Sequence, residues 1–254
     1  MWFFKKKPEY GVMDIGLTAD VHSHILPGVD DGSQEAKQSV DILRELHRFG
    51  VRKVMFTPHV SRAIFPNEAA DLRKRMEAFL PLIPAELTSD MQFFLGSEYM
   101  VDEFFGDITD RLRYPCGQIL IEMSYYERSR EIKDAIFNLV MDGIRPVLAH
   151  PERYVFYQKA FDRKKGVEEL INLVDMGCEL QLNIMSLTGA YGERSLGIVH
   201  WLLDAGLYSY IGTDVHSRHQ LDVLRNFKLD AAQMEAVRLL ARNNERLFET
   251  DSSH

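Results

Sequence analysis

Imidazole and carboxylate side chains recur along the chain in short motifs that could bind metal ions. The motifs are Asp20-Val21-His22-Ser23-His24, Thr57-Pro58-His59, Gly96-Ser97-Glu98, Ile121-Glu122, His150-Pro151-Glu152-Arg153 and Asp214-Val215-His216. On an extended strand, His-x-His and Asp-x-His place both side chains on one face. Imidazoles together with carboxylates suit manganese, iron or zinc, whereas oxygen donors alone suit magnesium or calcium. Because these motifs supply more donors than one ion needs, they predict a cluster of two or three ions, which could activate water and clamp the oxygens of a phosphoryl displacement.

The elements that must position these motifs are predicted from glycines and apolar runs. Gly50, Gly143, Gly177 and Gly206 each close an amphipathic stretch and precede a short apolar run, as expected where a helix ends before a buried strand. The predicted strands are 17–21, 51–57, 93–96, 118–123, 146–149, 179–184 and 208–212. The predicted helices are 34–49, 68–80, 131–142, 166–175 and 195–204, with further helices as far as residue 248. This alternation predicts an α/β protein with a parallel sheet, either open or closed.

The motifs stand at the ends of these strands. Six of the seven predicted strands carry His, Asp or Glu at the C-terminal end, and in a parallel barrel those ends converge on one face. Glu122 lies within an apolar strand, where a buried carboxylate needs a partner. By contrast, His47 and His200 lie within predicted helices and are expected to be packing or surface residues, and His219 belongs to no motif.

Composition sets the broad class. The chain has 254 residues, a formal net charge of −8, 27% charged and 46% hydrophobic residues, which are values of a globular protein. The acidic balance argues against a nucleic-acid binder, and no apolar run approaches the roughly 18–20 residues of a membrane span. We expect an N-terminal arm (1–16), one domain (17–249) and a C-terminal tail (250–254). Lys5-Lys6-Lys7 in the arm could touch an anionic membrane surface.

One run carries a family resemblance. Residues 20–33, Asp-Val-His-Ser-His-Ile-Leu-Pro-Gly-Val-Asp-Asp-Gly-Ser, resemble the opening motif of the bacterial manganese-dependent tyrosine phosphatases of the polymerase and histidinol phosphatase (PHP) superfamily, which are linked to capsule and exopolysaccharide synthesis. The other motifs follow in the family's order between residues 18 and 220. His-x-His alone would indicate only the superfamily, whereas Leu-Pro-Gly-x-Asp-Asp-Gly together with His-Pro-Glu-Arg is specific to the phosphatase branch.

The resemblance implies a distorted (βα)7 TIM-like barrel with a centre of three manganese ions at the C-terminal ends of the strands. Iron, zinc or magnesium could substitute. The family's ligands correspond in this chain to His22, His24, Asp31, His59, Glu98, Glu122, His150, Asp214 and His216. Asp30 adjoins Asp31, and spacing alone does not choose between them. Asp20 is expected to orient a ligand histidine without binding metal.

Two arginines are candidates for binding phosphate. Arg153 resembles the family's phosphate-binding arginine, and a guanidinium matches two phosphate oxygens. It could instead pair with Glu152 or another carboxylate. Family members carry a second arginine shortly after the last Asp-x-His; Arg218 is the nearest here, but its loop departs from the expected spacing.

The two cysteines argue against thiolate catalysis. Two are too few for a disulfide scaffold and fit a reducing compartment. A cysteine-dependent phosphatase needs an arginine six positions after its cysteine, whereas Glu122 follows Cys116 and Ile184 follows Cys178 at that distance. A thiolate nucleophile therefore has no support from the sequence.

The resemblance implies a cytoplasmic enzyme that hydrolyses protein phosphotyrosine with metal-activated water and without a covalent phospho-enzyme. Its expected substrate is a membrane-associated tyrosine autokinase of the polysaccharide export machinery, which nothing in the sequence names. The nearest alternative is a phosphatase for a small molecule such as histidinol phosphate. A metal-binding regulatory module without catalysis is disfavoured by the near-complete ligand set, and a nuclease is disfavoured by the acidic charge.

Overall fold

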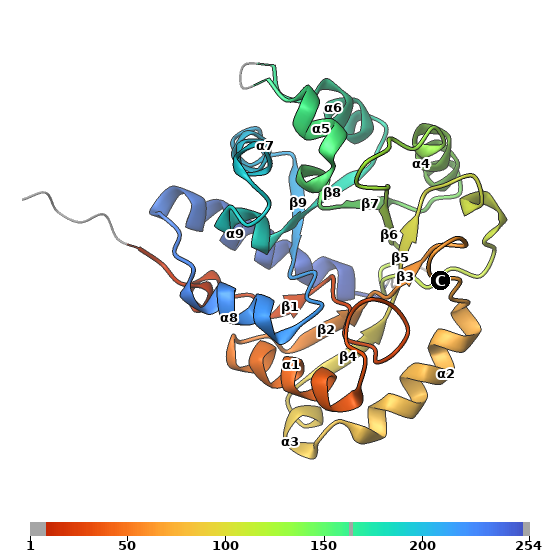
Figure 1. The fold of residues 1–254 in the computed structure, drawn as a ribbon, viewed down its shortest axis with the longest axis vertical. Helices are drawn as coiled ribbons and strands as arrows, with labels where there is room; N and C mark the ends of the chain where they lie inside the picture. The colour runs from red at the N-terminus through yellow and green to blue at the C-terminus, as the bar shows by residue number, and fades with distance from the viewer. Residues whose placement is uncertain (1–8, 163–164, 251–254) are drawn as a thin grey trace, which may run out of the picture.

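The predicted alternation of strands and helices is confirmed by the computed structural model, which describes residues 9–162 and 165–250. Figure 1 shows strands at the centre and helices around them. The strands are β1 (Ala19–Asp20), β2 (Lys53–Phe56), β3 (His59–Val60), β4 (Gln92–Leu95), β5 (Glu98–Met100), β6 (Ile119–Glu122), β7 (Pro146–Ala149), β8 (Glu179–Asn183) and β9 (Tyr208–Gly212). All pairings between these strands are parallel, so their C-terminal ends point the same way.

The strands form two sheets, one in the order β1-β2-β4 and one in the order β3-β5-β6-β7-β8-β9. The second predicted strand (51–57) corresponds to β2 and the third (93–96) to β4. After breaks at Thr57-Pro58 and at Gly96-Ser97, the chain continues into β3 and β5, which were not predicted. Pro58 has no N–H group to donate to a neighbouring strand, which accounts for the first break. At each break the chain passes from the β1-β2-β4 sheet into the six-stranded sheet.

A closed seven-stranded barrel is not shown. In the described part of the chain, β9 and β1 do not pair as strands. The segments that follow them form one parallel bridge between Ser23 and Val215. There the His24 N–H donates to the Val215 carbonyl at 2.9 Å, and the Asp214 N–H donates to the His22 carbonyl at 2.8 Å. The link therefore lies beyond the strands, among the motif residues themselves.

The predicted helices are present within a few residues of their expected bounds. The α-helices are α1 (Ala36–Arg48), α2 (Ala69–Phe79), α3 (Ala85–Thr88), α4 (Ile132–Met141), α5 (Val155–Ala160), α6 (Glu168–Asp175), α7 (Glu193–Asp204), α8 (Arg218–Asn226) and α9 (Ala231–Asn243). The 3-10 helices are η1 (Val12–Ile15), η2 (Leu80–Leu82), η3 (Phe105–Asp107), η4 (Pro151–Arg153), η5 (Ile184–Thr188) and η6 (Asn244–Phe248). The prediction omitted α3 and α5, because helices of four and six residues are too short to show an apolar repeat.

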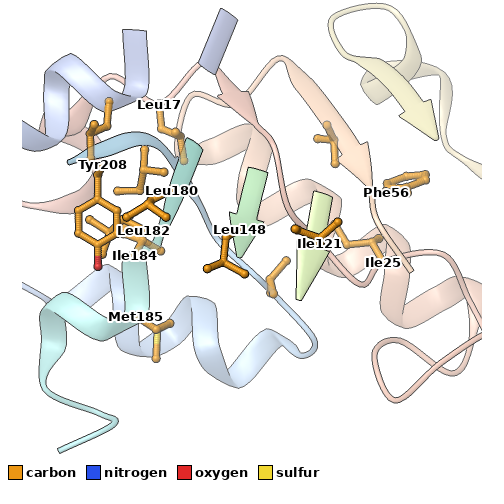
Figure 2. Close-up of a cluster of buried hydrophobic side chains, with 14 of the residues drawn as sticks. Leu17, Ile25, Phe56, Ile121, Leu148, Leu180, Leu182, Ile184, Met185 and Tyr208 are labelled. Carbon is orange, nitrogen blue, oxygen red and sulfur yellow. The ribbon is translucent and has the colours of Figure 1, made fainter. Parts of the chain in front are cut away.

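Apolar packing between the central strands maintains their register and so determines which residues stand at the strand ends. Ile121 of β6 is in register with Leu148 of β7, which is in register with Leu180 of β8, and all three are fully buried. Figure 2 shows these side chains on neighbouring strands. Each contributes about 1.5–3 kcal/mol by leaving water. A slip of one residue would also turn Glu122, the last residue of β6, to the opposite face.

The described part of the predicted N-terminal arm packs against the domain. Tyr10 and Leu229 exchange backbone hydrogen bonds of 2.9 and 2.8 Å, and Val12 and Ile15 are buried. Residues 1–8, which include the predicted basic stretch, and residues 251–254 of the predicted tail lie outside the described residues. Across the described ranges, no helix is long and apolar enough to cross a membrane.

Candidate metal centre

Nine imidazole and carboxylate side chains meet at the C-terminal ends of the strands. His22 and His24 follow β1, Asp31 precedes α1, His59 begins β3, Glu98 begins β5, Glu122 ends β6, His150 follows β7, and Asp214 and His216 follow β9. Their donor atoms form four overlapping groups, each within 4.8 Å: His24 with Asp31, His59 and His216; His22 with His24 and Asp214; His22 with Glu98 and His150; and His59 with Glu98 and Glu122. The structure thus brings together all nine side chains that the family resemblance indicated as ligands.

The donor atoms approach one another at the spacing that a shared ion would produce. His22 Nε2 lies 3.0 Å from His24 Nε2 and 3.2 Å from Glu98 Oε2. His59 Nδ1 lies 3.1 Å from Glu98 Oε2 and 2.9 Å from Glu122 Oε1. Two donors that bind one ion at about 2.1 Å and at right angles lie about 3.0 Å apart. Glu98, like His22, His24 and His59, belongs to two of the groups and could contribute to more than one ion.

Three polar atoms of cluster residues are buried without a hydrogen bond from the described residues. They are His150 Nδ1 and the facing pair Glu98 Oε2 and His59 Nδ1. Leaving a buried polar atom unpaired costs about 1–3 kcal/mol. A cation beside Glu98 Oε2 and His59 Nδ1 would satisfy both atoms. Five imidazoles and four carboxylates also form the donor set that manganese, iron or zinc prefers. The residues present therefore fit a metal centre.

Burial and mutual proximity shift the pKa values of the cluster in different directions. Burial disfavours ionised Glu98, but nearby imidazoles outweigh it and hold its pKa well below the usual value. Burial and the neighbouring Glu98 charge raise the pKa of Glu122. Burial and His24 oppose a charge on His59, yet Glu122 and Glu98 raise its pKa to about 9. Burial lowers the pKa of His150 to about 4, so that His150 is a neutral donor at pH 7.

Asp30 and Asp31 occupy different positions, although spacing left the choice between them open. Asp31 Oδ1 lies 3.5 Å from Nε2 of both His59 and His216. Asp30 Oδ2 instead accepts a hydrogen bond from His24 Nδ1 at 2.8 Å. Gly32 allows this close packing, because a Cβ atom there would lie 2.1 Å from the His24 carbonyl oxygen. The geometry therefore favours Asp31 over Asp30 as a ligand.

Backbone strain coincides with the cluster. Within the described ranges, the residues other than glycine with positive φ are His150 (φ 35°) and Asp214 (φ 50°). Such conformations cost about 1–3 kcal/mol and persist only where surrounding contacts enforce them. His150 directly follows β7 and Asp214 follows β9 after Thr213, so both strained residues are cluster members just beyond a strand.

Amide side chains that the sequence analysis missed contact the cluster. Gln181 Oε1 lies 2.9 Å from His22 Nδ1, and Asn183 Nδ2 donates to Asp214 Oδ2 at 2.7 Å. The signal was present, because both polar residues alternate with leucines in β8. Asp20 contacts His22 through the backbone and not through the ring: its Oδ1 accepts from the His22 N–H at 3.4 Å. Asp20 also accepts from the N–H and hydroxyl of Thr213 at 2.9 and 2.6 Å. Burial raises the pKa of Asp20 to about 6.

The motif after β7 organises the neighbouring loop. Glu152 is fully buried and accepts hydrogen bonds from the Asn183 N–H at 3.0 Å, the Ser186 hydroxyl at 2.6 Å and the Tyr208 hydroxyl at 2.8 Å. These contacts join η4 to β8, η5 and β9. The Glu152 carboxylate therefore binds these three donors and does not pair with Arg153.

Arg153 lies at the edge of the cluster, where its Nη1 donates to Asp214 Oδ2. Burial disfavours its charge, but Asp214 outweighs burial and raises the pKa of the guanidinium. The side chain is 18% exposed, so the cation is largely desolvated yet still open on one side. A guanidinium in this setting can bind an anion that enters the cluster.

Arg218 is not brought to the cluster. Ser217 and Gln220 form a capping box that begins α8, so Arg218 is the first residue of the helix. Its Nη2 lies 3.9 Å from Oε1 of Glu45 on α1. In this structure Arg218 therefore lies beside a carboxylate of α1 and not beside a cluster residue, and its role as a second phosphate-binding arginine stays a prediction.

Comparisons with known proteins place these features in a family. Tyrosine-protein phosphatase YwqE of Bacillus subtilis is 27% identical over 202 residues, which cover 78% of this chain and 77% of the relative. Tyrosine-protein phosphatase CpsB of Streptococcus pneumoniae is 32% identical over 213 residues, covering 78% of this chain and 82% of the relative.

A solved structure of known proteins is also similar in fold. It belongs to the crystal structures of YwqE from Bacillus subtilis and CpsB from Streptococcus pneumoniae, described as unique metal-dependent tyrosine phosphatases, and it matches with a TM-score of 0.73 and 25% identity over 91% of this chain and 94% of that chain. The family described as "Capsular polysaccharide synthesis, CpsB/CapC" matches residues 18–244, a span that contains all nine cluster residues. The chain belongs to this CpsB/CapC family of capsular polysaccharide synthesis.

Proposed function

We propose that the protein is a metal-dependent tyrosine phosphatase of capsule or exopolysaccharide synthesis. The carrying observation is the single cluster in which nine imidazole and carboxylate side chains lie beside the guanidinium of Arg153. The relatives named tyrosine-protein phosphatase support phosphotyrosine in protein as the substrate. The metal dependence stated for the solved relatives supports the metal requirement.

We assign the metal as manganese, in three ions. The proposed ligands are His22, His24, Asp31, His59, Glu98, Glu122, His150, Asp214 and His216. The overlap of the four donor groups supports more than one ion. When bound, such ions supply positive charge for phosphate oxygens and a water of lowered pKa.

The chain's own residues have separate tasks in this hydrolysis. Arg153 binds two phosphate oxygens and stabilises the charge that develops on them. Gln181 orients His22 through its Nδ1 atom, and Asp30 does the same for His24. The bond from phosphorus to the tyrosine oxygen breaks while a bond to the water oxygen forms. One proton passes from the attacking water to the phenolate, whose reference pKa is about 10. The products are tyrosine and inorganic phosphate.

The setting of the enzyme forms a further part of the proposal. We place the activity in a single domain of residues 17–249, in which the two sheets approximate a distorted seven-stranded barrel; the Ser23–Val215 bridge supports this arrangement. The proposed substrate is a membrane-associated tyrosine autokinase, dephosphorylated on the cytoplasmic side. The capsule-synthesis family supports this class of partner.

Chelation and metal addition test the function directly. The full chain is stripped with a chelator, manganese, zinc or magnesium is added back, and hydrolysis of a phosphotyrosine peptide and of histidinol phosphate is measured. We expect activity on the peptide that is lost on chelation and restored best by manganese. His22→Ala should abolish it, whereas His47→Ala is the matched control, since His47 pairs with Asp90 away from the cluster. Peptide hydrolysis that survives complete chelation, or turnover of histidinol phosphate alone, would overturn the proposal.

A further inference from the structure

The guanidinium of Arg153 is flanked by two tyrosine rings. Its Cζ atom lies 4.7 Å from the ring centroid of Tyr125 and 4.4 Å from that of Tyr191. Tyr125 follows β6, and Tyr191 lies between η5 and α7, so the rings come from separate loops. A guanidinium over an aromatic face is attracted by the ring's quadrupole, more strongly when it is desolvated.

Both rings are held by contacts of their own loops. The Tyr125 carbonyl accepts a hydrogen bond from the Val155 N–H at 2.8 Å, and the Tyr125 ring stacks on the His150 ring with centroids 5.6 Å apart. Tyr191 packs against the hydrophobic core, and the loop that leads to it begins at η5, which Glu152 holds through Ser186. Both rings therefore have contacts besides Arg153.

The donors of Arg153 are only partly used. A guanidinium has five N–H groups in one plane, and Nη1 donates to Asp214. Among the described residues, no acceptor bonds to Nε or Nη2 of Arg153. A cation held by the Asp214 carboxylate would compete with Arg153 for that group. The contacts with the two rings do not involve that carboxylate.

We propose that Tyr125 and Tyr191 form an aromatic clamp that holds the Arg153 guanidinium beside the cluster, with its unused N–H groups available to the phosphate of the substrate. The proposal rests on the proposed function. Both tyrosines are positioning residues, because they act through Arg153. Because the clamp already restricts the Arg153 side chain, less conformational entropy is lost when phosphate binds.

The test uses Tyr191, because Tyr125 also contacts His150. Binding of inorganic phosphate to the metal-loaded full chain is measured by calorimetry, together with kcat and KM for a phosphotyrosine peptide. We expect Tyr191→Leu to weaken phosphate binding and kcat/KM by about 2- to 30-fold, the value of a lost cation–π contact. Tyr191→Phe keeps the ring and should behave as the unmodified protein. In an Arg153→Ala background, Tyr191→Leu should cause no further loss.

Two results would overturn the clamp: unchanged phosphate affinity in Tyr191→Leu, or an equal loss from Tyr191→Leu with and without Arg153. Metal content and the midpoint of thermal unfolding check that each variant is folded. If Tyr191→Leu fails that check, Tyr125→Leu and Tyr125→Phe are compared in the same way. If the unmodified protein binds phosphate but hydrolyses no phosphotyrosine, the proposed function fails while the phosphate titration still decides on the clamp.

Discussion

Asp30 holds the Nδ1 atom of His24 at 2.8 Å, while Nε2 of the same ring lies 3.3 Å from both Glu98 and Asp214 in the cluster. The hydrogen bond fixes the orientation of the ring and favours the tautomer in which Nε2 is free to bind a cation. Asp31, the next residue, faces two other imidazoles of the cluster. Asp31 thus lies within the cluster, whereas the adjacent Asp30 orients one of its imidazoles from outside.

Replacing each of these two carboxylates in turn tests their separate roles. Asp31→Ala removes a donor and should lower the number of manganese ions retained per chain after dialysis. Asp30→Asn should keep the number at saturation but weaken the affinity by about 10- to 100-fold, the usual cost of losing a residue that orients a ligand. Metal titration followed by elemental analysis measures both quantities. The reverse pattern would show that Asp30 is the ligand.

The two arginines predicted to bind phosphate should differ sharply. Arg153→Ala removes a charged donor beside the cluster and should lower kcat/KM for a phosphotyrosine peptide by about 10²- to 10³-fold. Arg218→Ala is the matched control, because its side chain pairs with Glu45 on α1, and should leave kcat/KM unchanged. An equal loss in both variants would contradict the assignment of Arg153 alone.

Thiol modification should leave activity intact. Burial raises the pKa of the Cys178 thiol to about 12, and neither cysteine belongs to the donor groups of the cluster. Cys116→Ser, and treatment of the folded protein with iodoacetamide, should therefore preserve phosphotyrosine hydrolysis. Loss of hydrolysis in the modified protein, with its metal content unchanged, would point to a thiolate that the proposed mechanism does not contain.

Glu152 should matter for stability through the hydrogen bonds that it accepts. Glu152→Ala leaves buried donors of Asn183, Ser186 and Tyr208 without an acceptor and should lower the free energy of unfolding by about 3 kcal/mol. Glu152→Gln keeps one acceptor oxygen and should cost less. Urea unfolding at one fixed metal concentration measures the difference. Equal losses in the two variants would indicate that charge, not hydrogen bonding, is the stabilising property.

The sequence by itself determined the order of elements and the types of ligand. His22 with His24, and Asp214 with His216, stand two residues apart because that spacing puts both side chains on one face of extended chain. Their position after apolar runs placed them at the ends of parallel strands, where side chains from distant segments converge. These inferences depend on local patterns, whereas the full set of nine residues, Asp31 included, came from the family resemblance.

Only the tertiary structure decided the direction of side chains in the loops. Arg218 turns to Glu45 because α8 packs beside α1, and Asp31 faces the cluster because Gly32 passes against His24. The flanking of Arg153 by Tyr125 and Tyr191 joins three loops. The bridge between Ser23 and Val215 likewise joins distant segments beyond the ends of β1 and β9. Such contacts are set by the packing of residues far apart in the chain, and no local spacing encodes them.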